Sequence, residues 1–123
     1  MEITAKYPAG VIGTTEENLK EAAMGEYEEY TDLYPEFARI AAEEGFPKVS
    51  AAFKMIAVAE KVHEQRFLKF LANLQTGKVF ESEDTELWLC RNCGYVHEGK
   101  KAPKICPACE HPQAYFEKQA KNY

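Results

Sequence analysis

Two long segments of the chain carry apolar residues at steps of three and four, the spacing that gathers side chains on one face of an α-helix. In the second segment these apolar positions are Phe53, Ile56, Phe67, Phe70 and Leu74. Between Ile56 and Phe67 the same steps fall on Glu60 and His63. A carboxylate and an imidazole therefore occupy the middle of a face that is otherwise apolar.

Signals for the ends of two helices flank these segments. Thr14 and Glu17 fit a capping box, in which each side chain bonds the other residue's backbone N–H. Gly45 fits the glycine in the left-handed conformation that commonly ends a helix, and Pro47 suits the first turn of the next helix. Gly77 fits the end of that second helix. Two long helices with so short a turn predict an antiparallel helical hairpin.

One residue conflicts with the first helical pattern. Pro35 lacks the amide that would bond the carbonyl of Thr31, and an interior proline costs about 3 kcal/mol and bends a helix. The apolar stripe resumes at Phe37 and Ile40. We therefore expect a kink between Thr31 and Pro35 rather than the end of the helix.

The first segment has the same acidic interruption as the second. Its expected inward positions are Leu19, Ala22 or Ala23, Glu26, Glu29, Leu33, Phe37 and Ile40. Glu26 and Glu29 precede the turn by nearly as many residues as Glu60 and His63 follow it. At about 1.5 Å of rise per residue, the four polar side chains are expected to meet at one height between the helices.

Three carboxylates and an imidazole buried together repel one another and lose hydration, and a divalent or trivalent cation removes both costs. Inward Glu residues with a Glu-x-x-His pair are the ligand pattern of di-iron carboxylate bundles, and Glu60-Lys-Val-His63 is such a pair. Oxygen and nitrogen ligands favour iron or manganese. The alternative, in which the pair lies on a solvated helix face, stays open.

Several neighbouring residues are assigned ordinary roles. Three charged residues are expected to be surface positions: Glu28, Lys61 and Glu64. Three tyrosines are expected to pack, although one of them could hydrogen-bond a ligand carboxylate: Tyr27, Tyr30 and Tyr34.

The four cysteines form two Cys-x-x-Cys pairs, Cys90 with Cys93 and Cys106 with Cys109. Four thiolates presented in this way predict a tetrahedral sulfur site for zinc or for iron, which the spacing does not distinguish. Disulfides are the alternative, and they suit exported proteins. The N-terminus lacks the basic start and apolar core of a signal peptide, so a reduced, cytoplasmic protein is expected.

The net charge and the length of the apolar runs limit the classes of partner that the chain can bind. The net charge is −5, which disfavours nucleic acid as a partner. No apolar run approaches the roughly 20 residues of a membrane span.

We expect a helical domain with an N-terminal linker over residues 1–80 and a small metal-binding domain over residues 81–123. The acidic segment ESEDTE, residues 81–86, is expected to be the hinge.

The segment WLCRNCGYVHEGKKAPKICPAC resembles a rubredoxin, although a simple rubredoxin has a glycine where this chain has Glu110. The segments GEYEEYTDLYPEFARIAAEEGF and IAVAEKVHEQRFLKFL, followed by this tail, resemble the rubrerythrin family in their order. The resemblance implies that four residues are di-iron ligands: Glu26, Glu29, Glu60 and His63. It also implies an Fe(Cys)₄ site with four ligands: Cys90, Cys93, Cys106 and Cys109.

The resemblance further implies a peroxidase that reduces hydrogen peroxide to water, with electrons from a soluble reductase or rubredoxin relayed through the Fe(Cys)₄ iron. A full rubrerythrin bundle has four helices, and this chain resembles its second half. The segment EITAKYPAGVIG resembles the link between the two helix pairs. The expected fold is mainly α: half of a ferritin-like bundle, completed by another chain, and then a rubredoxin-like domain.

The missing helix pair is expected from a second copy in a homodimer, or from a separate chain. Two other functions remain open. One is a rubredoxin-type electron carrier that forms no di-iron site. The other is a zinc-ribbon interaction module, in which zinc replaces iron.

Overall fold

The computed structural model describes residues 2, 4 and 10–122. The chain folds into two compact units, residues 1–72 and 73–123, which are treated separately below. The expected N-terminal linker lies mostly outside the described residues. This division places the last turn of the second long helix with the second unit, and the sequence-based domain boundary at residues 80 and 81 stays a prediction.

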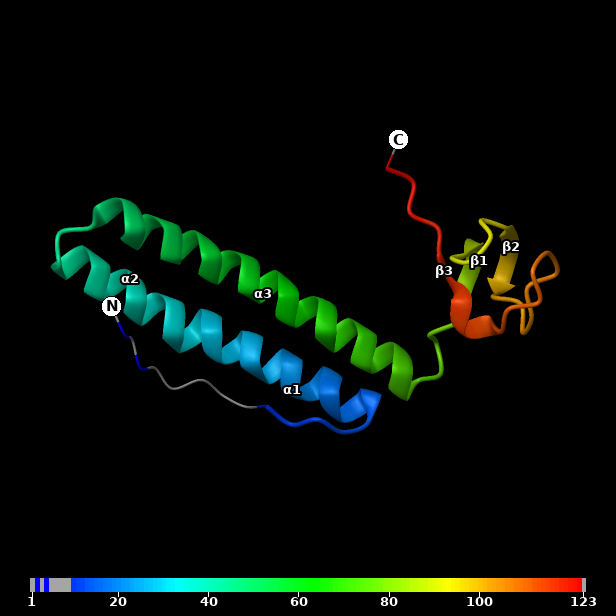
Figure 1. The fold of residues 1–123 in the computed structure, drawn as a ribbon, viewed down its shortest axis with the longest axis horizontal. Coiled ribbons are helices and arrows are strands. Elements are labelled where there is room, and N and C mark those ends of the chain that lie inside the picture. The colour runs from blue at the N-terminus through cyan, green and yellow to red at the C-terminus, as the bar shows by residue number, and fades with distance from the viewer. Residues whose placement is uncertain (1, 3, 5–9, 123) are drawn as a thin grey trace. The chain divides into compact units, whose positions relative to one another are not determined.

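The first unit is an antiparallel helical hairpin (Figure 1). Its elements are α1 (Thr15–Glu28), the π-helix η1 (Glu29–Leu33), α2 (Tyr34–Glu43) and α3 (Pro47–Gln75). The first three form one continuous rod that lies alongside α3. None of the described helices has the length and apolar character needed to cross a membrane.

The predicted helix ends are confirmed. The backbone N–H of Thr14 donates to Glu17 Oε2 at 2.8 Å, and the N–H of Glu17 donates to Thr14 Oγ1 at 3.3 Å, which completes the capping box. Gly45 and Gly77 have φ values of 84° and 69°, the left-handed conformation that glycine adopts readily. Pro47 is the first residue of α3.

The interruption expected between Thr31 and Pro35 takes the form of one π-helical turn. The N–H of Tyr34 donates to the carbonyl of Glu29, five residues earlier. The Thr31 hydroxyl also donates to the Tyr27 carbonyl at 2.7 Å. The wide turn thus accommodates Pro35, which has no N–H to donate, without ending the helix.

Small buried residues of α2 pack toward α3 after the π-helical turn. Ala38 and Ala41 are buried and Tyr34 is partly buried. Leu33, Phe37 and Ile40 stay 38–42% exposed in this hairpin, although the Phe37 ring contacts Phe53 of α3. One hairpin therefore does not cover this part of the apolar stripe by itself.

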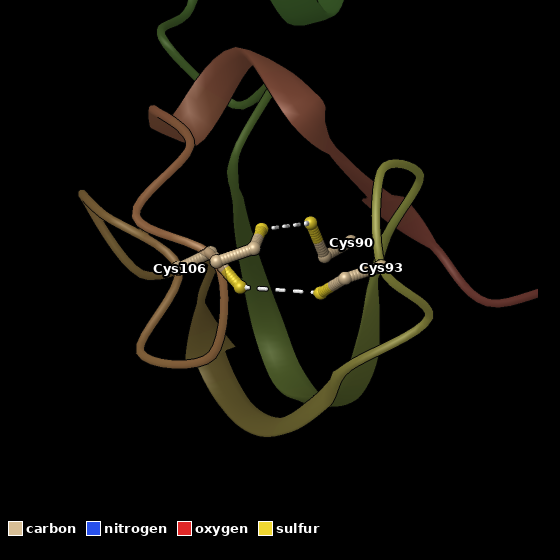
Figure 2. Close-up of side chains that lie close together, drawn as sticks. Cys90, Cys93 and Cys106 are labelled. Atoms are coloured by element: carbon tan, nitrogen blue, oxygen red, sulfur yellow. Dashed lines mark hydrogen bonds between the residues drawn. The ribbon is translucent and has the colours of Figure 1, made fainter.

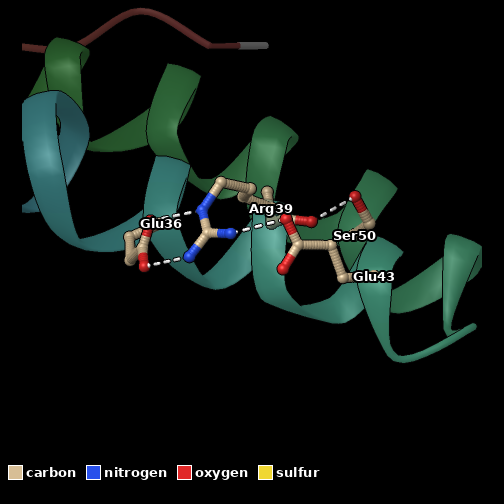
Figure 3. A network of polar contacts seen from close by, with 5 residues as sticks. Glu36, Arg39, Glu43 and Ser50 are labelled. Carbon is tan, nitrogen blue, oxygen red and sulfur yellow. Dashed lines mark hydrogen bonds and ion pairs between the residues drawn. The ribbon is translucent and has the colours of Figure 1, made fainter.

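Polar and aromatic contacts join α2 to α3. Ser50 is 4% exposed, and its hydroxyl donates to the Ala38 carbonyl at 2.6 Å (Figure 3). The Phe53 ring lies 5.4 Å from Phe37 and 6.0 Å from Tyr34, measured between centroids. These contacts fix the register of α2 against α3 in the part of the hairpin nearest its turn.

A three-stranded antiparallel sheet and two cysteine turns form the second unit. Its elements are β1 (Glu81–Cys90), β2 (Val96–Lys101), the 3₁₀-helix η2 (Gln113–Tyr115) and β3 (Phe116–Lys118), with strand order β2-β1-β3. Buried Trp88 lies at the centre, and its Nε1 donates to the Gly99 carbonyl at 2.9 Å. Phe116 and Ala102 complete the small core with the buried cysteines.

The acidic segment 81–86 is not a hinge, which corrects the sequence-based expectation. It forms the first part of β1, and turns and irregular backbone over residues 76–80 connect α3 to the strand. Lysines neutralise the acidic residues: Lys101 Nζ lies 2.7 Å from Glu81, and Lys118 Nζ lies 2.6 Å from Glu86. Cross-strand pairing of opposite charges stabilises an acidic strand that composition alone assigns to a loop.

Candidate metal centres

The first cluster lies between the two long helices. Glu26 comes from α1, and Glu60 and His63 come from adjacent turns of α3. One donor atom from each side chain lies within 4.8 Å of the other two. His63 Nδ1 is 2.6 Å from Glu60 Oε2 and 3.5 Å from Glu26 Oε2. Two helices therefore bring together two carboxylates and one imidazole, as the hydrophobic pattern predicts.

Burial makes the cluster electrostatically unfavourable without a cation. The Glu26 and Glu60 side chains are 18% and 12% exposed, and His63 is 52% exposed. Desolvation raises the pKa of Glu26 above its usual value, and so do the hydrogen bond and the charge of Glu60. The charge of His63 lowers it, and that of Glu29 raises it. A bound cation would remove this repulsion, so the donor set fits iron or manganese.

Glu29 does not join the other three expected ligands. It is the first residue of the π-helical turn and is partly buried. Its negative charge contributes to the raised pKa values of Glu26 and Tyr34, so it lies near the cluster. Three of the four sequence-based ligand candidates thus converge on one point, and the fourth stands beside them.

Tyr34 lies near the same cluster. Burial raises the pKa of its phenol, and the charges of Glu29, Glu60 and Glu26 raise it further. Tyr34 is therefore the tyrosine whose ionisation the candidate ligands oppose, whereas Tyr30 donates to Glu64, which is not a candidate ligand.

Glu64 was wrongly assigned to the surface. It is partly buried, and the hydroxyl of Tyr30 donates to its Oε2 at 3.1 Å across the hairpin. The signal was present in the spacing: Tyr30 follows Glu26 by four residues, and Glu64 follows Glu60 by four. Each therefore lies one turn along the same helix face as a candidate ligand.

The second cluster contains the four cysteines (Figure 2). Cys90 Sγ lies 3.7 Å from Cys109 Sγ, and Cys93 Sγ lies 3.7 Å from Cys106 Sγ. A disulfide would need about 2.05 Å. Four sulfurs held about 2.3 Å from a central ion are about 3.8 Å apart at tetrahedral angles, so the thiols fit zinc or iron.

The two cysteine turns repeat the same backbone contacts. The N–H of Gly94 donates to the Cys90 carbonyl at 2.8 Å, and the N–H of Glu110 donates to the Cys106 carbonyl at 2.9 Å. Both residues are left-handed, with φ values of 81° and 60°. Glu110, the departure from a simple rubredoxin, therefore adopts the conformation that its turn requires although it is not a glycine.

The ionisation of the thiols is uneven. The backbone N–H of His111 lowers the pKa of Cys109 to about 6. The N–H of Tyr95 likewise lowers the pKa of Cys93, but desolvation and the neighbouring sulfurs outweigh it and raise the value to about 12. Four thiolates held this close need a cation, because each negative sulfur disfavours the next.

Both parts of the chain match known families. Residues 2–71 match the family model described as rubrerythrin, and residues 88–117 match the one described as rubrerythrin, rubredoxin-like domain. The chain is 58% identical to a rubrerythrin from Porphyromonas gingivalis, over 100% of this chain and 62% of that protein. It is 56% identical to a rubrerythrin from Nitratidesulfovibrio vulgaris, over 95% of this chain and 61% of that protein.

A solved structure of nigerythrin in a mixed-valence state shares the fold, with a TM-score of 0.51 and 32% identity. That likeness covers 94% of this chain and 55% of the nigerythrin chain. The chain spans about three fifths of the length of the curated relatives it matches. The helical hairpin, the four-thiol site and these matches agree, and the chain belongs to the rubrerythrin family.

Proposed function

We propose that this protein is a non-haem iron redox protein that reduces hydrogen peroxide to water at the helical cluster. Membership of the rubrerythrin family and the four-thiol cluster support the iron redox class. The observation that carries the finer proposal is the convergence of Glu26, Glu60 and His63 donor atoms within 4.8 Å. Iron held by these residues would supply electrons to peroxide, and iron held by the four cysteines would supply reversible one-electron transfer.

Glu26, Glu60 and His63 would hold iron in the hairpin through two carboxylates and one imidazole, which leaves coordination positions open. Glu29 stands outside this set and is proposed as a ligand for a second ion. Tyr34 keeps its own proton, because burial and the charges of Glu29, Glu60 and Glu26 raise the pKa of the phenol.

Reduction of one peroxide molecule to two waters consumes two electrons and two protons. In the metal-free cluster, before any such reaction, Glu26 is a carboxyl that can hold a proton. Glu26 holds a proton more tightly than an exposed glutamate, because desolvation and Glu60 raise its pKa. We propose Glu26 as a proton-holding group in the metal-free cluster, which releases its proton when a cation binds.

The hairpin presents apolar side chains that it does not cover itself. They lie at the end of the π-helical turn, on α2 and on α3: Leu33, Phe37, Ile40 and Phe70. Covering a side chain of this size contributes about 1.5–3 kcal/mol. We propose that a second helix pair, from another copy of this chain or from a separate chain, packs there and adds ligands for a second ion.

Electron transfer alone is the second candidate function. The observation in its favour is that one chain presents all four thiols, whereas its helices bring together three ligand atoms and leave His63 half exposed. In that case the helical cluster would hold no redox metal. A protein with zinc in the thiols would lack redox activity at that site and would have no visible colour.

Peroxide turnover by the reduced, iron-loaded protein tests the proposal. The wild type should consume peroxide and regain the visible absorption of its oxidised iron–thiolate site. Glu60→Gln should abolish turnover and keep the colour, whereas the exposed Glu28→Gln control should behave as the wild type. Equal turnover in Glu60→Gln, or none in the wild type, would reject the peroxidase in favour of the electron carrier.

A further inference from the structure

Three exposed apolar residues form a stripe on the side of α3 that faces away from the rod. Met55, Val58 and Val62 follow one another at steps of three and four, and they are 65%, 61% and 59% exposed. Val62 stands two positions from both Glu60 and Glu64, which is about 200° around a helix. Those two carboxylates are partly buried on the inward side of α3, so the three apolar residues, the outer stripe, lie opposite them.

Cations surround the outer stripe. The chain has a net charge of −5, yet α3 contains five Lys or Arg residues and only two carboxylates, Glu60 and Glu64. The five cationic side chains are all exposed: Lys48, Lys54, Lys61, Arg66 and Lys69. Because both carboxylates lie on the inward side, the outward side of α3 carries cations alone.

These cations lack the carboxylate partners that other cations of the protein have. Several cations elsewhere form ion pairs: Arg39, Lys78, Lys101 and Lys118. Within the described part of the chain, Lys54, Lys61 and Lys69 form no ion pair. Arg66 lies over the Phe70 ring at 5.6 Å, a contact that leaves its charge in place. Like charges on one helix face repel, so the fold of the hairpin gains nothing from this arrangement.

We infer that the outer stripe and its cations are a docking surface for an acidic amphipathic helix of a partner protein. Apolar side chains of that helix cover the outer stripe, and carboxylates beside them pair with Lys54 and Lys61. The two lysines are seven residues apart, about 10.5 Å along α3, which matches two carboxylates seven residues apart on a helix lying alongside. The inference goes beyond the proposed function, because none of these residues is a candidate metal ligand.

Other occupants fit this surface less well. The net negative charge of the chain opposes the approach of nucleic acid. Helices that bind lipid surfaces present Trp, Phe or Leu, whereas the outer stripe consists of Met55, Val58 and Val62. Two copies of α3 would bring like charges together. Phe70, on which a second helix pair is proposed to pack, lies about 80° around α3 from Val62, so that pair uses a different side.

A designed peptide provides the probe. It is a fluorescein-labelled helix with leucines at i, i+3, i+4 and i+7 and glutamates on both flanks. The full-length protein, its four thiols filled with one equivalent of Zn²⁺, is titrated into the peptide at low salt, and fluorescence anisotropy reports binding. We expect saturable binding that weakens about tenfold or more in high salt, because salt screens the ion pairs. A peptide with lysine in place of every glutamate should not bind.

Matched variants locate the surface. The double variant Lys54→Glu with Lys61→Glu should weaken peptide binding by about tenfold or more. The control Lys20→Glu with Lys100→Glu changes the net charge equally at exposed lysines elsewhere and should bind as the wild type does. Val58→Ser with Val62→Ser should also weaken binding, because it removes apolar contact area. Circular dichroism checks that each variant keeps its helices.

Three results would overturn the inference. The first is a wild type that does not bind the acidic peptide, or an equal loss of binding in the control variant. The second is binding to phosphatidylserine vesicles without binding to the peptide, which would assign the surface to lipid. The third is dissociation of a wild-type oligomer by Lys54→Glu with Lys61→Glu, which would assign it to a contact between copies. Peroxide turnover enters none of these measurements, so each result leaves the proposed function untouched.

Discussion

The Ser50 hydroxyl donates a 2.6 Å hydrogen bond to the Ala38 carbonyl and thereby links the first turn of α3 to α2. Ser50 is the buried polar residue of the described hairpin. Ser50→Ala removes this contact between the helices and leaves a carbonyl lone pair without its partner. The free energy of unfolding should fall by about 1 kcal/mol, measured by chemical denaturation of the metal-free protein.

The neighbouring surface network provides the contrast (Figure 3). Arg39 pairs with Glu36 at 2.6 Å and with Glu43 at 2.5 Å, all on the exposed side of α2. Because solvent and salt screen these charges, Arg39→Ala should have a smaller effect that declines in high salt. A larger loss for Arg39→Ala than for Ser50→Ala would contradict this ranking.

The Glu26 carboxylate should destabilise the metal-free hairpin at neutral pH. Its pKa is raised in the folded state, so folding favours the protonated form and stability falls as the pH rises above the ordinary value of 4.5. Glu26→Gln should therefore raise the melting temperature at pH 7, and this gain should vanish below pH 4.5. Thermal unfolding in a chelator checks this, and a gain that grows at acid pH would contradict it.

Loss of one thiol should affect the second unit alone. Cys106→Ser removes one of four ligands, so the visible absorption of the oxidised iron protein should disappear. The helical signal in circular dichroism should remain, because the hairpin has its own contacts. Serine at Cys93 should act in the same way. A parallel loss of helicity would show that the hairpin depends on the thiol site.

The two cysteine turns should respond oppositely to changes at their left-handed residues. Gly94→Ala forces a side chain into a backbone conformation that costs about 1–2 kcal/mol, although no atom lies within 4 Å of the new Cβ. Glu110→Gly removes a similar strain and should stabilise the iron-loaded unit slightly. Thermal loss of the visible colour measures both, and equal effects would reject the strain argument.

Most of the hairpin could be predicted from local signals. The capping box at Thr14 and the left-handed Gly45 act over a few residues, so the sequence determines them directly. Glu60 and His63 were found because they interrupt an apolar pattern. The Cys-x-x-Cys spacing also identified the thiol site, because each pair of cysteines forms one local turn.

The remaining features depend on contacts between distant segments. The sequence predicted an interruption near Pro35, but periodicity assumes a regular α-helix and does not show that the interruption is a π-helical turn. The strand at residues 81–86 depends on Lys101 and Lys118, which lie far along the chain. Glu64 was assigned to solvent because its partner, Tyr30, is on the other helix.

The extra residue in the turn from Glu29 to Leu33 allows one continuous rod to contain a proline. Deleting exposed Asp32 would close the wide turn and place Pro35, which has no N–H to donate, inside a regular α-helix. The same residue alters the backbone at Glu29, near the helical cluster. One insertion therefore links the tolerance of Pro35 to the position of a candidate ligand.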